Sequence, residues 1–383
     1  MRDDQPKRQT DIGLHTALLF LAVALGALLQ AAGPPWVRAI FEKVNFTSAG
    51  NASAVLLALA AAVVMHEAGH FFMAWACDFE ILGGKLGPLR LERLHGMRKI
   101  SVSWRGLFSC SVAAVPRSCA YWQGRMMLVV AAGPAATLAG FVVAVRVATS
   151  LNLGSWAAAF WSALTLFHFF LFVLGLIPNS ESARIRNDAR LFLELQRCGA
   201  GARELNLYHR LTQLRLAASR PCDYPASLLS EAALSPGRPE ANLLVARTHT
   251  EWALDSDDVA AADVWDRRAL EQGEGCDGRA RNSALAASGC FDILFRGDTA
   301  AAREKLQKVD FNVLFPKYLA HRAKAAWLLA NGRLGEVPAQ VLRAQYAIPL
   351  GLPYYDFERM LLGKLHLKAL GVSEGTLVSA AAG

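Results

Sequence analysis

The sequence SAVLLALAAAVVMHEAGHFFMAWAC, residues 53–77, combines the length of a membrane-spanning helix with three titratable groups. About 20 apolar residues in a row are needed to cross the roughly 30 Å of hydrocarbon in a bilayer. Within this run stand His66, Glu67 and His70. Ionisable groups are costly in a membrane unless they pair, bind an ion or face a polar cavity, so these three predict a functional site.

Three further segments are long and apolar enough to span a bilayer. They are residues 14–33, about 123–147 and 156–178. The segment 14–33 could instead be a signal peptide, because basic residues precede it and small residues follow, but its apolar run is long for that role. We therefore expect four membrane spans, preceded by a cytosolic tail of residues 1–13.

Charge is unevenly distributed along the 383 residues. Charged residues are scarce between positions 14 and 178 and frequent afterwards, which predicts a membrane half followed by a soluble half. The formal net charge is +8, but basic and aromatic residues do not interleave, which favours anionic lipid headgroups over nucleic acid as the partner. Seven cysteines without a Cys-x-x-Cys pair favour reduced thiols over a disulfide framework or a cysteine-rich zinc site.

The distribution of lysine and arginine predicts the orientation in the membrane, since these residues are enriched in cytosolic loops. The N-terminal tail has three and the segment 78–120 has seven, whereas the segment 34–52 has two and 149–155 has none. We therefore expect a multi-pass protein of the cell membrane with both termini and the segment 78–120 in the cytosol. The histidines of the second span then lie toward the cytosolic face.

Residues 66–70 form the pattern His-Glu-x-x-His. Positions i and i+4 share one face of a helix, so both imidazoles can bind one zinc ion, and Glu67 can act as general base on the attacking water. A hydrogen-bonded polar cluster between helices is the alternative interpretation. The setting within an apolar span favours the zinc site. His168, alone in the fourth span, is interpreted as a core histidine rather than a ligand.

A catalytic zinc site needs a third protein ligand and an open position. A metzincin would have Gly at 73 and His at 76, where this chain has Met73 and Ala76. Glu92 could serve as the thermolysin-like glutamate, but it lies in a segment that alternates like a strand. The preferred candidate is Asp188, which opens a helix just after the fourth span, at the depth of the histidines. Glu181 is its competitor.

Three stretches together resemble the site-2 protease family of intramembrane zinc metalloproteases. They are HEAGH in the second span, AAGPAATLAG (131–140) in the third, and LIP followed by NDARL after the fourth, all within residues 53–195. The resemblance implies that His66, His70 and Asp188 bind Zn²⁺ and that Glu67 activates water.

This sequence departs from the family pattern at three positions. The Asp-Gly of the family is Asp188-Ala189 here, and Thr137 and Gly175 stand where asparagines are common. The loss of an asparagine at 175 points to an altered substrate clamp or a weakened enzyme, although no ligand is lost. The sequence does not indicate which residues bind substrate.

The segment 80–116 is expected to form strands on the cytosolic side. Residues 89–104 alternate apolar and polar side chains around His95-Gly96, as in a hairpin, and residues 106–116 resemble a further strand. In the resembling family, strands beside the active site bind unfolded substrate by adding it to a sheet edge. A hairpin that only covers the membrane face is equally compatible with the pattern.

From about residue 191 the pattern predicts successive amphipathic helices joined by short turns. The turn residues Asp258, Asp298 and Gly332 lie 40 and 34 positions apart, which suits degenerate tetratricopeptide-like helix pairs. The aromatic signature positions are inconsistent, so a plain helical bundle is the alternative. Helix-pair repeats commonly bind a protein partner on a concave face.

The expected fold is an all-α membrane core with a small β region, residues 14–190, followed by an α-helical soluble domain, residues 191–383. The expected function is zinc-dependent endopeptidase cleavage of transmembrane or membrane-associated proteins. One alternative is an inactive scaffold of the same family that acts through its helical domain. A metal transporter is disfavoured, because the other spans lack charged or histidine-rich pairs.

The topology is testable by cysteine labelling. A membrane-impermeant thiol reagent applied from outside is expected to label Asn51→Cys and Ser150→Cys and to leave Arg98→Cys unmodified, as the lysine and arginine bias requires. Labelling at Arg98→Cys with protection of the other two positions would reverse the proposed orientation.

Overall fold

The computed structural model describes residues 34, 35, 40, 49–102, 110–150, 155–179, 186–235, 237–276 and 278–371. The chain divides into two compact units. The first comprises Met1–Arg90 and Val102–Gly199, and the second comprises Leu91–Ser101 and Ala200–Gly383. The predicted tail 1–13 and the predicted first span 14–33 lie outside the described residues.

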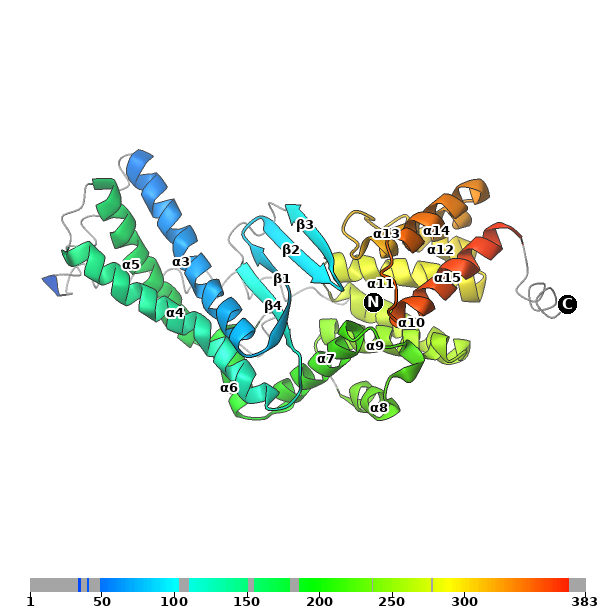
Figure 1. The fold of residues 1–383 in the computed structure, drawn as a ribbon, viewed down its shortest axis with the longest axis horizontal. Helices are drawn as coiled ribbons and strands as arrows, with labels where there is room; N and C mark the ends of the chain where they lie inside the picture. Colours follow the sequence, from blue (N-terminus) through cyan, green and yellow to red (C-terminus); the bar gives the residue numbers. More distant parts are fainter. Residues whose placement is uncertain are drawn as a thin grey trace, which may run out of the picture. The chain divides into compact units, whose positions relative to one another are not determined.

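Three long helices dominate the first unit: α3 (Ala49–Ala76), α4 (Trp122–Ser150) and α5 (Ser155–Leu176). Each contains a stretch long and apolar enough to cross a membrane. They coincide with the predicted spans at 53–77, 123–147 and 156–178. Each packs against the other two, so the described part of this unit is a bundle of three candidate membrane helices (Figure 1).

Small side chains allow these helices to approach one another closely. Ala58 and Ala62 of α3 lie in one buried cluster with Ala144 of α4 and Ala163 of α5. Without a hydrophobic driving force in lipid, close backbone packing of this kind holds membrane helices together. Large apolar side chains such as Phe72 lie on the outside of the unit instead. This distribution suits a bundle surrounded by hydrocarbon.

A four-stranded antiparallel sheet follows α3, which confirms that the region 80–116 forms strands. Its strands are β1 (Phe79–Leu86), β2 (Leu89–Leu94), β3 (Met97–Val102) and β4 (Cys110–Pro116), in the order β3-β2-β1-β4. The predicted hairpin turns at His95 and Gly96, both with positive φ, at 46° and 79°. The strand β1 was not predicted as an element of its own. Its Phe79 packs with Ala74 and Val129, so the sheet joins directly to α3 and α4.

The second unit is helical, as expected. Its helices are α7 (Ala200–Leu216), α8 (Ala226–Leu234), α9 (Pro239–Asp255), α10 (Val259–Glu274), α11 (Gly278–Phe291), α12 (Thr299–Leu306), α13 (Lys317–Ala330), α14 (Val337–Tyr346) and α15 (Tyr354–Ala369). The helices α9–α14 form three consecutive pairs, and the predicted turn residues lie between the two helices of each pair: Asp258 in the first, Asp298 in the second and Gly332 in the third. Asp258 and Asp298 cap α10 and α12 identically, each accepting a hydrogen bond from a backbone N–H three residues on at 2.9 Å.

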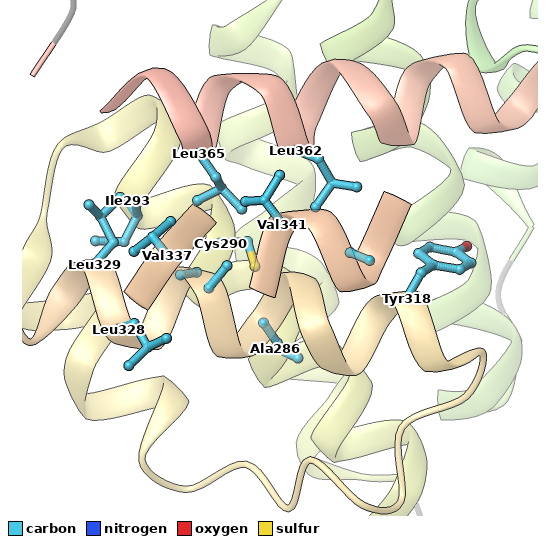
Figure 2. Close-up of a cluster of buried hydrophobic side chains, with 14 of the residues drawn as sticks. Ala286, Cys290, Ile293, Tyr318, Leu328, Leu329, Val337, Val341, Leu362 and Leu365 are labelled. Carbon is cyan, nitrogen blue, oxygen red and sulfur yellow. The ribbon is translucent and has the colours of Figure 1, made fainter. Parts of the chain in front are cut away.

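The largest buried cluster of the second unit lies between its last helix pairs and α15 (Figure 2). Val337 and Val341 of α14 and Leu362 and Leu365 of α15 point into it, together with Ile293. Removing one such fully buried side chain costs about 2–5 kcal/mol. This core therefore accounts for the position of α15 against α14.

The hairpin of β2 and β3 belongs to this helical unit, although it precedes α4 in the chain. The Nδ1 atom of His95 lies 2.6 Å from the hydroxyl of Tyr355, and its Nε2 atom lies 2.9 Å from the carbonyl oxygen of Leu216. Lys99 donates to the carbonyl oxygen of Asn312 at 2.6 Å. The helical unit is thus built from two separate stretches of chain.

Acid should destabilise the helical unit through a buried histidine. Burial lowers the pKa of His209, on α7, to about 4. An unfolded histidine titrates near 6.5, so the folded form loses stability as the pH falls from about 6.5 to about 4, by up to about 3 kcal/mol. We expect urea unfolding of the full chain, followed by circular dichroism, to show this loss between pH 7 and pH 4.5.

The variant His209→Leu cannot bind that proton and should lose much less stability over the same pH interval. Part of the dependence should persist, because burial also lowers the pKa of His249. Equal losses in the variant and the parent would assign the acid sensitivity to other groups.

Candidate metal centre

Two elements of the first unit bring three side chains to one point. His66 and His70 lie on successive turns of α3, and Asp188 is the first residue of α6 (Asp188–Gln196). One ligand atom from each lies within 4.8 Å of the others, and all three side chains are half-buried. Among the described residues this is the one group with the composition and spacing of a metal site.

The three distances fit a single small ion. The Nε2 atoms of His66 and His70 are 3.3 Å apart, and they lie 3.1 and 3.4 Å from one carboxylate oxygen of Asp188. Ligand atoms at about 2.0–2.1 Å from a tetrahedral zinc ion are separated by about 3.3–3.4 Å. The three atoms therefore form one face of a tetrahedron, which leaves the fourth position to a water or a substrate.

Hydrogen bonds on the far side of each ring orient the histidines. The Nδ1 atom of His70 lies 2.8 Å from the carbonyl oxygen of Val129, which can only accept, so this nitrogen carries the proton. The Nδ1 atom of His66 lies 2.9 Å from the hydroxyl of Thr137, and that hydroxyl donates to the carbonyl oxygen of Gly133 at 3.0 Å. In its neutral form, each ring with its proton on Nδ1 presents an unprotonated Nε2 atom to the centre.

This arrangement requires a positive charge at the centre. Two nitrogen lone pairs and a carboxylate oxygen face one another at 3.1–3.4 Å and repel unless a proton or a cation lies between them. Burial disfavours ionisation of Asp188, but when a proton lies at the centre, hydrogen bonds and positive charge from the histidines outweigh burial and lower the pKa of this carboxyl to about 2. Asp188 is therefore a carboxylate at neutral pH. The donor set of two imidazoles and one carboxylate is one that zinc accepts.

The segment before α6 positions Asp188 through a pair of asparagines. Asn187 is the N-cap of α6, and its side chain accepts from the backbone N–H of Arg190 at 3.1 Å. Its side-chain oxygen also accepts from the N–H of Asn179, and its amide donates to the carbonyl oxygen of Ile177, at 2.6 Å. The start of α6 is thereby tied to the end of α5. An asparagine directly before a helix is the sequence signal that identifies this N-cap.

Glycines of α3 and α4 make the room that the histidines occupy. A Cβ atom on Gly133 would lie 2.2 Å from the Nε2 atom of His70. A Cβ atom on Gly69 would lie 2.4 Å from the carbonyl oxygen of Ala132. Any side chain at either position would push α3 and α4 apart. Gly133 and Gly69 therefore serve the packing of α3 and α4 directly beside the two histidines.

The remaining candidate residues fall in different places. Glu67 is half-buried on α3 and interacts electrostatically with both histidines and with Asp188. Glu92 belongs to the second unit, where it pairs with Arg279, and is not part of the triad. Glu181 lies outside the described residues. His168 is fully buried on α5, and neither of its ring nitrogens has a hydrogen-bond partner among the described residues.

Comparisons of this chain with protein-family models, with curated proteins and with solved structures find no match. The interpretation of the site therefore rests on its own geometry and on the sequence pattern.

The hydroxyl of Thr137 offers a direct test of histidine orientation. Thr137→Val keeps the shape of the side chain but removes the acceptor of the His66 Nδ1–H group, so the ring loses its orientation. Removal of such a partner typically weakens metal binding by about 10–100-fold. Competition with a chromophoric chelator measures the zinc affinity of the purified variant.

Thr149→Val is the matched control, because within the described part of the chain its hydroxyl bonds only to carbonyl oxygens of its own helix. Its zinc affinity should equal that of the parent. A Thr137→Val variant that binds zinc as tightly as the control would show that the hydroxyl does not orient the ligand.

Proposed function

We propose that this chain is an intramembrane zinc metalloendopeptidase that resembles the site-2 protease family. The observation that supports this most strongly is the convergence of three lone-pair atoms at the edge lengths of a zinc tetrahedron. The hydrogen bonds that the rings donate to Thr137 and Val129 add to it, because they prepare both rings as ligands. Glu67, adjacent to one ligand, supplies the general base that hydrolysis needs.

Each residue has a distinct task in this proposal. A zinc ion bound by His66, His70 and Asp188 supplies Lewis-acid chemistry, lowering the pKa of water and polarising a peptide carbonyl. Glu67 takes a proton from the attacking water as the new C–O bond forms. It then returns this proton to the amine nitrogen as the C–N bond breaks. Asp188 remains ionised throughout and balances part of the positive charge.

The location of the site restricts the substrate. The histidines lie in the last three turns of a helix long and apolar enough to cross the membrane, and their side chains are half-buried between helices. A helical substrate has its peptide bonds hydrogen-bonded internally, so it must unwind before a carbonyl can reach the centre. The expected substrates are transmembrane or membrane-associated segments that unwind easily. This chain is expected to lie in the cell membrane with both of its termini in the cytosol.

An inactive scaffold of the same family is the second candidate. The observation that favours it is Gly175 on α5, where a Cβ atom would meet nothing within 4 Å. The space that a substrate-holding asparagine would fill is thus open. In that case the helical pairs of the second unit carry the function by binding a protein partner.

Two acidic variants separate these candidates. Glu67→Gln should keep its zinc and lose about 10²–10⁴-fold of its cleavage rate, because a general base is removed while the ligands stay. Asp188→Asn should lose both zinc and activity, because a neutral amide is a poor zinc ligand. Zinc per protein in detergent-purified variants and cleavage of a model membrane peptide are the measurements.

Glu181→Gln serves as the control and should change little. A fully metallated and active Asp188→Asn variant would show that another residue is the third ligand. Zinc in the parent without any cleavage would favour the scaffold, and Glu67→Gln that cleaves as well as the parent would exclude the protease mechanism.

A further inference from the structure

One surface segment of the helical unit has almost no charge. Residues 337–355, VPAQVLRAQYAIPLGLPYY, contain a single charged residue, Arg343, and no acidic one. Several of their apolar side chains are exposed rather than buried: Leu342 is 52% exposed, Tyr346 83% and Leu350 87%. Leu342 and Tyr346 are four residues apart on α14 and therefore share a face. Exposed apolar groups gathered in this way mark an interaction surface.

A basic hollow of about 710 Å³ lies beside this face. Its lining includes Trp327 and three cationic side chains, Lys324, Arg333 and Arg343, but only one acidic side chain, Glu336. Glu336 is already bound to Arg333 through two hydrogen bonds of 2.6 and 2.7 Å. Lys324 and Arg343 are exposed and make no ion pair within the described part of the chain. The hollow thus presents two uncompensated positive charges to a ligand.

We propose that this surface of α13 and α14 docks onto an anionic bilayer, with Leu342, Tyr346 and Leu350 in the interface and a phosphate-bearing lipid headgroup in the hollow. Tyrosine and leucine beside arginine are the residues that suit the membrane–water boundary. Each basic residue near an anionic surface adds to binding. The proposal does not depend on the zinc chemistry, only on the presence of the chain in a membrane.

Two observations favour lipid over other occupants. The helical unit is covalently continuous with helices long enough to cross a membrane, so a bilayer surface is always within its reach. A second copy of this chain is disfavoured, because a symmetric interface brings the same surface of both copies together and the segment 337–355 has no acidic residue to pair with Arg343.

Photo-crosslinking of the full chain in lipid nanodiscs tests the proposal. The photoreactive amino acid benzoylphenylalanine replaces Tyr346 in one protein and Leu234 in another. Leu234 is the matched control, at 85% exposed on α8. In nanodiscs containing phosphatidylglycerol, we expect at least about five-fold more lipid adduct at position 346 than at position 234, because only the former is held at the interface.

Charge reversal tests the headgroup site. Arg343→Glu should reduce the lipid adduct at position 346 by about ten-fold in anionic nanodiscs. Arg281→Glu, which changes an exposed arginine of α11 outside the hollow, should leave it unchanged. Nanodiscs of phosphatidylcholine alone should give the low adduct level of the Arg343→Glu variant.

Hydrogen exchange of the unsubstituted chain gives a second measurement that needs no variant. Backbone amides of residues 346–352 should exchange more slowly in anionic than in zwitterionic nanodiscs. The proposal would be overturned by equal lipid adducts at positions 346 and 234. It would also be overturned if position 346 crosslinked to a second copy of this chain or to another protein. Hydrogen exchange that does not respond to lipid charge would overturn it as well.

Discussion

The first unit depends on one electrostatic constraint: three electron-pair donors face one another beside a bundle of three candidate membrane helices. Their side chains are half-buried, so leaving the cluster without a neutralising charge costs several kcal/mol. The surrounding residues are arranged accordingly. Val129 and Thr137 hold the protons of both rings away from the centre, and Gly133 gives His70 the room to turn inward. The asparagine pair before α6 holds the carboxylate in place.

Features of the fold that depend on residues close together in the chain could be predicted from the sequence, whereas contacts between distant residues could not. The three helices of the bundle follow from local apolar patterns, so their ranges were predictable to within a few residues. For the second unit the patterns predicted successive helices and the turns at Asp258, Asp298 and Gly332, but not the bounds of each helix. The triad was predictable in part, because i and i+4 spacing fixes the two histidines on one face. The prediction of Asp188 as the third ligand rested on its expected depth in the membrane, which matches that of the histidines. In sequence, Thr137 stands out only as a departure from a family pattern, yet its hydroxyl is the partner of His66.

Long-range placement was beyond the reach of sequence patterns. The alternation around His95 and Gly96 predicts a hairpin but does not say which surface it covers. Its contacts are with Tyr355, Leu216 and Asn312, more than one hundred residues away in the chain. No local signal encodes such a pairing. The same holds for Glu92, whose partner Arg279 lies on α11.

The placement of this hairpin has a consequence for biosynthesis. His95 leaves the ribosome 260 residues ahead of Tyr355. At about 5–20 residues per second, the hairpin waits roughly 13–50 s for the surface on which it packs. During that interval the strands β2 and β3 have only the sheet to hold them, while the candidate membrane helices α4 and α5 are synthesised. The helical unit therefore completes its fold last, after the whole bundle that precedes it has left the ribosome.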